Sequence, residues 1–423
     1  MTSPCGRWRA PVGQAARQGK GHPVNAPDAP HPENGTFRDP AAHGGEDPRR
    51  GLLDPVPDAD DAALFRRLVD DTITTERLEA LARPVQPRHG VDHVLAIHWH
   101  PQHVPLDVAR RRLAALFPDA RDMLVIPTEH NVLHVWGDHA GVEADCRDLR
   151  LGLKVQLLLH FRADRVREAH TLRAMLDHTA LYRGIQLRAL LETAARPDEA
   201  GHRHRVERAV RATGSGPEVL ATAAACAAKL LCLLDAERDA PPADERRSTL
   251  LRDFVEARRP QLGPVLTPQV HAYTKALRDR VKAEFPLDFF HDAHAFMEEA
   301  RGLGGLVTIP HPEQFWPILL AGYDVDAIEV WNPQSRRHTN FLISVVNEAN
   351  AKHPSAKPTL VTMGDDTHFG EMLRLPDGPE QARLAREIGV QPLWEDPVTL
   401  KELERAGMTR ERVIDAFRQR LGG

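Results

Sequence analysis

Cysteine and aromatic residues are scarce in this sequence of 423 residues, and both shortages narrow what the chain can be. The 4 cysteines show neither CxxC spacing nor the spacing of a secreted scaffold, which argues against a disulfide framework and a zinc ribbon and fits a reducing cytoplasm. Aromatic residues make up only 5% of the chain, so leucine, valine and alanine must supply most of the core. The length is sufficient for a full core without such covalent support.

The chain also lacks a strong excess of charge and a long apolar run. Its 55 basic and 60 acidic residues give a net charge of -5, which offers no whole-chain attraction to nucleic acid or to an anionic membrane. No apolar segment follows Arg7 and Arg9, so we expect no signal peptide. The longest apolar run, residues 219–234, contains Lys229 and is shorter than the roughly 20 residues of a membrane span. We therefore expect a buried alanine-rich helix in a cytoplasmic protein without a membrane partner.

Histidine, in contrast, is abundant. The sequence contains 23 histidines, and this side chain is both the commonest metal ligand and the one that titrates near neutral pH. The excess justifies a search for a metal or acid–base site, although it does not locate one.

Composition divides the chain into four parts. Residues 1–57 are rich in proline and glycine and poor in large apolar side chains, so we expect a disordered tail. Residues 58–161 and 301–423 alternate strand and helix signals, whereas residues 162–300 carry helical signals. The pattern predicts an α/β fold with a large helical insertion. We interpret the insertion as a structural packing element or as an oligomerisation surface, and the latter would make the protein a homo-oligomer.

Local patterns predict the individual elements. Strand, helix and strand signals over residues 91–127 indicate parallel pairing. The predicted strands are 91–97, 123–127, 154–161, 305–310, 327–331 and 359–363, and the predicted helices are 61–83 with Asp60 or Asp61 as its cap, 106–117, 313–321 and 400–421.

Two clusters of polar residues follow predicted strands in the first part. In Ile97-His98-Trp99-His100 the two histidines stand at i and i+2, so they point to the same side of an extended chain and can converge on one ion. In the second cluster, Thr128-Glu129-His130-Asn131 follows an apolar run. Polar residues at the ends of parallel strands are typical of catalytic sites in α/β folds.

Three further clusters complete the pattern. Glu143, in Gly-Val-Glu, offers a carboxylate that can bridge two cations. His311 stands between two prolines, which hold the backbone rigidly, and Asp366 and His368 follow the last apolar strand at i and i+2. Imidazole and carboxylate ligands without thiolates indicate a site for Zn, Mn or Fe.

The order HxH, TEHN, GVE, GGLVTIPHP, DAIEVWN and GDDTH resembles that of the polymerase and histidinol phosphatase (PHP) superfamily, over residues 91–161 and 300–370. The resemblance implies a distorted (β/α)7 barrel that holds two or three divalent ions. It further implies that the metal ligands are His98, His100, His130, Glu143, His311, Asp366 and His368, and that Asp366 and His368 take part in catalysis. Glu329 to Asn332 resembles a strand of the family that serves as scaffold.

The sequence departs from the family pattern at two places. Glu129 stands where the family usually has aspartate, and the spacing to Glu143 is short, so Glu129 as the bridging carboxylate with His134 as the next ligand is an alternative. Gln156 stands where the family normally has a ligand histidine, and His160 would replace it only if the strand shifted.

The resemblance implies a metal-dependent phosphoesterase in which metal-activated water attacks a phosphate ester. The expected substrate is a phosphorylated small molecule or nucleotide, nucleic acid is not excluded, and Arg336 and Arg337 are candidates for neutralising the phosphate. An amidohydrolase-like metal hydrolase and a degenerate metal-binding or regulatory module are the alternatives.

Overall fold

The computed structural model describes residues 50–84, 86–236, 249–333, 336–352, 357–373 and 386–422. The predicted tail therefore lies largely outside the described residues. Its last part includes the short helix α1 (Arg50–Leu53), and Leu52 is buried. The expectation of disorder up to residue 57 is thus wrong at its C-terminal end, because Leu52 contributes to a hydrophobic core.

The helix predicted to begin near Asp61 is divided into α2 (Ala59–Val69) and α3 (Thr75–Leu81). Its cap is Asp58 rather than Asp60 or Asp61. The Asp58 side chain accepts a hydrogen bond from the Asp61 backbone N–H, and the Asp61 side chain accepts one from the Asp58 N–H. This reciprocal capping box satisfies two donors that would otherwise have no partner in the first turn.

Strand β1 (His93–Ala96) and strand β3 (Asp122–Val125) pair in parallel, and α4 (Leu106–Leu116) connects them, which confirms the predicted strand–helix–strand unit. Just beyond β1, the short strand β2 (Trp99–His100) pairs in parallel with β10 (Thr367–His368). This pairing joins segments that are far apart in the sequence.

The remaining strands form one six-stranded sheet. In order, they are β4 (His134–Trp136), β5 (His139–Asp148), β6 (Leu153–Arg162), β7 (Leu306–Ile309), β8 (Ala327–Trp331) and β9 (Leu360–Met363). Strands β4 to β7 pair antiparallel and strands β7 to β9 pair in parallel. The α/β class is confirmed, but the strands of the described chain form three sheets and no closed barrel.

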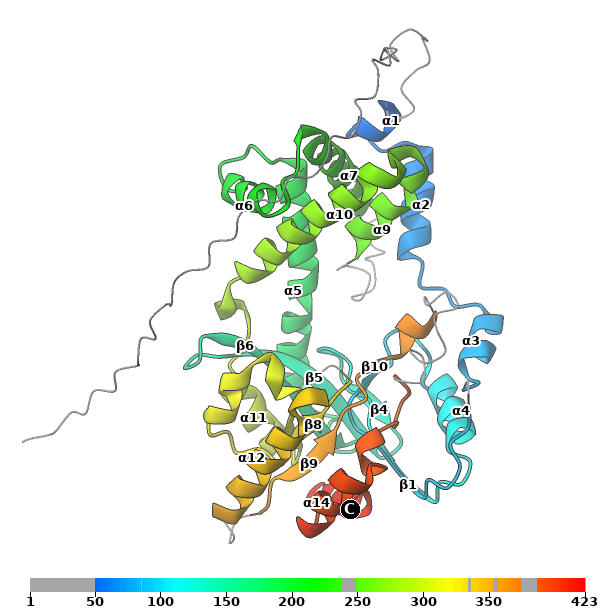
Figure 1. The fold of residues 1–423 in the computed structure, drawn as a ribbon, viewed down its shortest axis with the longest axis vertical. Helices are drawn as coiled ribbons and strands as arrows, with labels where there is room; N and C mark the ends of the chain where they lie inside the picture. The colour runs from blue at the N-terminus through cyan, green and yellow to red at the C-terminus, as the bar shows by residue number, and fades with distance from the viewer. Residues whose placement is uncertain are drawn as a thin grey trace, which may run out of the picture. The chain divides into compact units, whose positions relative to one another are not determined.

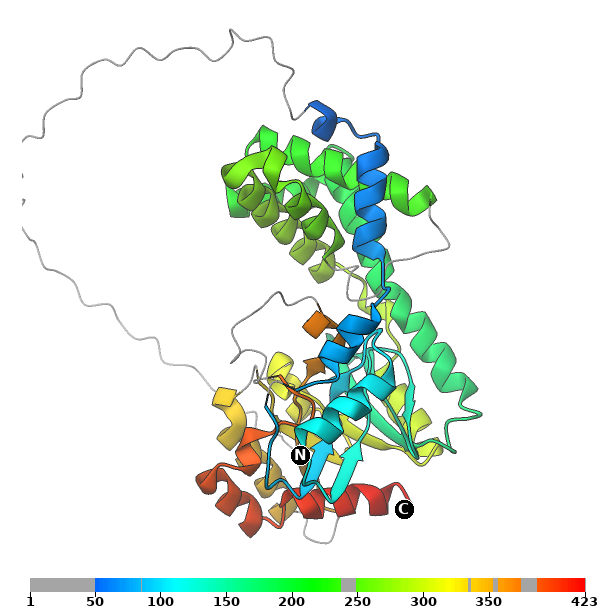
Figure 2. The same cartoon turned by 90° about the vertical axis from the view of Figure 1, so that its right-hand side faces the viewer.

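A group of helices separates β6 from β7 in the sequence. It consists of α5 (His170–Ala195), α6 (Arg203–Thr213), α7 (Pro217–Ala236), α9 (Leu250–Ala257) and α10 (Arg259–Ala283), which share a hydrophobic core with α1 and α2 (Figures 1 and 2). The backbone of α10 is kinked at Gly263, whose φ is 79°. Helix α11 (Ala293–Gly302) follows and packs on β5 and β6 instead.

Helix α7 contains the alanine-rich run. By length and composition it is the one helix of the described chain that could cross a membrane, but 56% of its apolar window is buried. It packs against α5, α9 and α10, and the Lys229 side chain is buried with an ion-pair partner. The expectation of a buried core helix is confirmed.

The last part of the chain covers the parallel strands with helices. These are α12 (Thr339–Lys352), α14 (Pro397–Arg405) and α15 (Arg410–Arg420), and α15 lies beside β1 (Figure 2). The single helix predicted from Leu400 to Leu421 is divided because Gly407 adopts a φ of 71°.

Short 3-10 helices occupy several connections. They are η2 (Leu287–Phe289), η3 (Pro312–Gln314), η4 (Trp316–Leu320), η5 (Arg336–His338), η6 (Phe369–Leu373) and η7 (Pro392–Trp394). The α-helix predicted over residues 313–321 is wrong, because η3 and η4 each begin with a proline near their first residue and Phe315 between them has an extended φ of -148°.

Candidate metal centre

Backbone pairing brings the predicted ligand segments to one place. His100 and His368 are direct register partners in the β2–β10 pair. His130 forms an isolated bridge with Glu143, which lies in the middle of β5. The Asp366 N–H donates to the His98 carbonyl at 3.0 Å, so the segment after β9 lies against the segment after β1.

The seven predicted ligands form three overlapping groups, within each of which the donor atoms lie within 4.8 Å of one another. The groups are His100, His130 and His368; His98, His100 and Asp366; and His98, Glu143 and His311. Each group offers three imidazole or carboxylate donors, which suits a divalent ion. The arrangement thus gathers every residue that the motif order predicts.

Glu143 lies at the centre of these contacts. One carboxylate oxygen, Oε1, is 3.3 Å from His311 Nε2. The other, Oε2, is 2.7 Å from His130 Nδ1 and 3.6 Å from His100 Nε2. Because its two oxygens face different histidines, Glu143 has the geometry of a bridging carboxylate.

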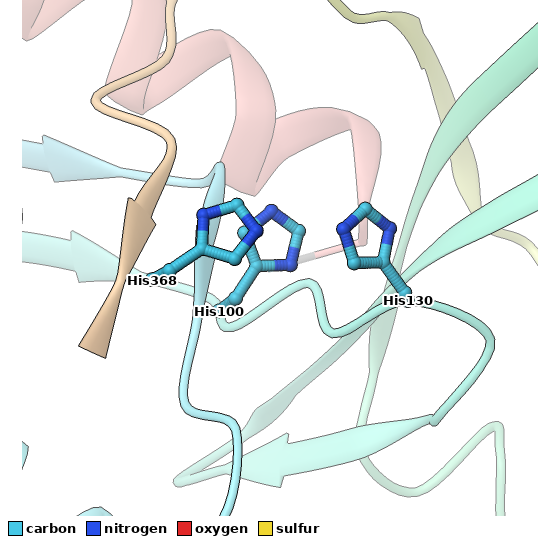
Figure 3. A group of neighbouring side chains, drawn as sticks. All are labelled: His100, His130 and His368. Carbon is cyan, nitrogen blue, oxygen red and sulfur yellow. The ribbon is translucent and has the colours of Figure 1, made fainter. Parts of the chain in front are cut away.

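His100 lies between two other imidazoles (Figure 3). Its ring centroid is 4.4 Å from that of His130 and 4.4 Å from that of His368, with both pairs stacked. The three rings come from β2, from the loop after β3 and from β10. Stacking leaves both ring nitrogens of His100 without a hydrogen-bond partner, so packing alone does not compensate for the burial of this ring.

Several buried donor and acceptor atoms at this site have no hydrogen-bond partner. They are His98 Nε2, His100 Nδ1 and Nε2, His130 Nδ1, Glu143 Oε1 and Oε2, and His311 Nδ1. The short contact between His130 Nδ1 and Glu143 Oε2 lacks hydrogen-bond geometry. Buried polar atoms without partners cost about 1–3 kcal/mol each, so the donor set fits bound cations, which would satisfy these atoms together.

His98 is oriented by a buried carboxylate. Its Nδ1 lies 2.6 Å from Glu329 Oε2 in a hydrogen bond, which leaves Nε2 directed at the cluster, 3.7 Å from Asp366 Oδ1. The other oxygen of Glu329 accepts from the His311 N–H at 3.1 Å. A carboxylate behind a histidine fixes the ring and its tautomer, as is usual beside metal ligands.

The residues of the site shift one another's pKa values. Burial alone would raise the pKa of Glu143, but His130 and His311 hold it well below its ordinary value. Burial would lower the pKa of His98, but Glu329 outweighs burial and raises it to about 9. His368 has the opposite balance, because burial and the neighbouring His100 lower its pKa to about 3. The Glu143 carboxylate is therefore ionised and the His368 imidazole is uncharged. These are the protonation states in which such side chains bind metal ions.

Strained backbone is concentrated at the same place. The non-glycine residues of the described chain with positive φ are Gln102, Asn131, His311 and Asp366. Two of them are predicted ligands and Asn131 adjoins a third. Such conformations cost about 1–3 kcal/mol each and persist where the surrounding structure holds them for a function.

Neither sequence alternative enters the metal groups. Glu129 accepts hydrogen bonds from the backbone N–H of Gln102 at 2.6 Å and of His130 at 2.9 Å, and lies 3.7 Å from His100, while His134 is in β4. His160 contacts the carbonyl of Ile97 at 2.9 Å and packs against Phe417. It therefore does not replace a ligand at Gln156, and neither residue belongs to a group.

Two positioning features were not among the predicted site residues. Glu329 was interpreted as scaffold, although its place at i+2 from Ala327 on a buried strand is a detectable signal for an inward-facing carboxylate. Asn131 exchanges two hydrogen bonds with Asp145, each 2.9 Å long, and so fixes the backbone beside His130. Arg336 and Arg337 lie in the exposed turn η5, outside the metal groups.

A search of protein-family models finds no match to this chain, and a search of curated protein sequences finds none either.

Proposed function

We propose that this chain is a metal-dependent phosphoesterase of the PHP type, with the three sheets as a distorted, open form of that family's (β/α)7 barrel. One observation carries the proposal. Seven residues, predicted as ligands from motif order, come from separate segments of the chain and meet with several of their buried donor atoms lacking partners. The helices between β6 and β7 would then be an insertion in that barrel.

The ligand atoms limit how many ions the centre would hold. His98 has only Nε2 available, because Nδ1 is used by Glu329, so it can serve only one of the two groups to which it belongs. Glu143 can serve two ions through its two oxygens. We therefore propose two or three ions, of Zn, Mn or Fe, since the donors are nitrogen and oxygen without thiolate.

The more exposed residues of the cluster, His368 and Asp366, would take part in the reaction with the substrate. The side chains of His368 and Asp366 are 23% and 10% exposed, more than those of His98 and His100. His100 and His98 outweigh burial and keep the pKa of Asp366 far below its ordinary value, so this carboxylate is ionised, whereas His368 is uncharged. The uncharged His368 can accept a proton and pass it toward a leaving oxygen, whereas the ionised Asp366 would act on the reaction through its negative charge. Bound divalent ions would supply the acidity that activates water and would neutralise charge on the phosphoryl group.

The first experiment measures metal in the purified protein. We expect two or three Zn, Mn or Fe ions per chain by elemental analysis, and a loss of at least one ion in His311→Ala, because His311 supplies one donor of the group that contains Glu143. His170→Ala is the matched control, since His170 is an exposed histidine that pairs with Glu168 and belongs to none of the metal groups of the described residues. Unchanged metal content in His311→Ala would refute the site.

A substrate screen then separates the proposed activity from the two alternatives. The metal-loaded protein should hydrolyse phosphomonoesters, phosphodiesters or nucleotides, and should lose about two to four orders of magnitude in rate in His368→Ala. Hydrolysis of amides or deamination instead would assign an amidohydrolase-like function. One ion or none, with no hydrolysis of any kind, would assign a metal-binding module.

A further inference from the structure

Helix α5 belongs to two hydrophobic cores. Leu172, in its first half, is buried with strands β5 to β7, whereas Leu187, in its second half, is buried in the core of the helical group (Figures 1 and 2). Between these halves, Tyr182 is buried and lies within hydrogen-bond distance of Lys154 on β6. A polar contact therefore connects the helical group to the large sheet at this position.

Two aromatic rings hold the ammonium group of Lys154. Its Nζ lies 4.8 Å from the centroid of the Tyr182 ring and 5.5 Å from that of the Phe290 ring, and it donates to the Tyr182 hydroxyl at 3.4 Å. The two rings contact each other edge to face, with centroids 5.1 Å apart. Because a cation is attracted to the face of an aromatic ring, Tyr182 and Phe290 determine where the positive charge of Lys154 lies.

Lys154 forms an ion pair with Asp145 of β5, whose side chain is fully buried. The two side chains share a face of the sheet, because Asp145 is the register partner of Gln156 and Lys154 stands two residues before Gln156. Lys154 contacts Oδ1 of Asp145, and the other oxygen, Oδ2, accepts from Asn131 Nδ2 at 2.9 Å. The Asp145 N–H also donates to Asn131 Oδ1 at 2.9 Å, so Asp145 connects Lys154 to Asn131.

Asn131 follows the ligand His130 directly and has a backbone φ of 56°. Its N–H donates to the Glu143 carbonyl at 2.8 Å, and both ends of its side-chain amide are held by Asp145. A left-handed backbone is costly for a residue other than glycine, so these hydrogen bonds are what keep Asn131 in it. Since this conformation sets the course of the chain beside His130, it also sets the distance of 4.4 Å between the imidazoles of His130 and His100.

We propose that Lys154 and Asp145 are positioning residues for the metal ligand His130, and that the helical group, through Tyr182, thereby controls the affinity of the ion at the group that contains His130. Neither Lys154 nor Asp145 belongs to a metal group of the described residues, so both would act through the backbone beside His130 and not by touching the ion. The inference rests on the metal centre proposed above, but not on its phosphoesterase activity. It gives the helices between β6 and β7 a role at the site in addition to packing.

The test measures the affinity of the full chain for Zn²⁺ by competition with a chromophoric chelator. Lys154→Met should weaken the binding of one ion by about 10–100-fold, the usual effect of removing a group that orients a metal ligand. Asp145→Asn should have a similar effect, because a single amide oxygen must then serve both Lys154 and Asn131. This variant keeps the shape of the buried side chain, so it provides the test even if Lys154→Met does not fold. The double variant should bind like Asp145→Asn alone, since Lys154 acts through Asp145.

The matched control is Lys229→Met, the same substitution at a lysine of α7 whose ion pair with Asp61 is also buried. It perturbs the helical group without touching Asp145, so its affinity for Zn²⁺ should equal that of the wild type. Wild-type affinity in both Lys154→Met and Asp145→Asn, an equal loss in Lys229→Met, or losses that multiply in the double variant would overturn the proposal. A wild-type protein that binds no Zn²⁺ would instead refute the metal centre itself.

Discussion

The absence of a side chain at Gly364 allows the backbone after β9 to lie close to His98. A Cβ atom at this position would lie 2.1 Å from Glu329 Oε2 and 2.6 Å from His98 Nδ1. Because both atoms belong to the buried pair that orients His98, Gly364→Ala should displace the pair and weaken metal binding by about 10–100-fold. Metal affinity can be measured by competition with a chromophoric chelator.

The matched control for this prediction is Gly302→Ala. A Cβ atom at Gly302 meets nothing within 4 Å, and its backbone needs no positive φ. It should keep the affinity of the wild type. Equal affinity in Gly364→Ala would show that the Glu329–His98 pair does not control the ligand.

His160 should make the fold sensitive to acid. Burial lowers its pKa to about 4, against an ordinary value of 6.5, so the folded state binds its proton more weakly than the unfolded state. Its contribution to stability is complete above pH 6.5 and is lost as the pH falls toward 4. The wild type should lose free energy of unfolding between pH 7.5 and pH 4.5, and we expect His160→Asn to reduce this loss by about 2–3 kcal/mol. The measurement is urea unfolding at both pH values with a chelator present, and an unchanged pH dependence would contradict the assignment.

A buried ion-pair network links helix α7 to helix α2, in addition to the hydrophobic core that they share. Lys229 Nζ lies 2.6 Å from Asp61 Oδ2 of α2 and donates to the Gly51 carbonyl at 2.8 Å, and Asp61 also contacts Arg258. Both partners of the Lys229–Asp61 pair have side chains that are 3% exposed. Lys229→Met should lower the free energy of unfolding by about 3–5 kcal/mol, because it leaves buried acceptors without their donor.

The comparison for α7 is Lys275→Met on α10. Lys275 forms an i,i+4 pair with Asp279 and is 67% exposed, so the cost should be below about 1 kcal/mol. The free energies of unfolding of both variants can be measured by urea denaturation. Equal, small losses would mean that the buried pair adds nothing to the attachment of α7 to α2.

Glu143 reaches the metal centre from the middle of strand β5 and not from a strand end. Ala140, Val142, Ala144 and Cys146 are buried in one hydrophobic core, while Glu143 and Asp145 point to the other face. This strict alternation is the signal of a strand, and it was available in the sequence. The (β/α)7 barrel that the resemblance implies would carry its ligands at the ends of parallel strands, whereas Glu143 lies mid-strand in an antiparallel pair with β6.

In the molecule as a whole, the sheets are joined where the ligands lie. The Thr128 N–H donates to the Trp99 carbonyl at 2.9 Å, and the Gly364 N–H donates to the Trp331 carbonyl at 2.9 Å. Together with the Asp366–His98 bond, these contacts connect segments from four strands around one centre. Such contacts cannot be predicted from local sequence patterns. Each joins residues that are distant in the sequence, and hydrophobic periodicity does not indicate which distant segments pair.

The sequence alone determined the α/β class, most strands, the buried helix α7 and the identity of the residues that gather at the centre, because hydrophobic periodicity and short motifs are local properties. Only the tertiary structure decided the antiparallel half of the large sheet, the roles of Glu329 and Asn131, and the exclusion of Glu129, His134 and His160 from the metal groups. The physical reason is the same in each case: which atoms a buried polar group faces depends on long-range pairing and on the space left by distant residues such as Gly364.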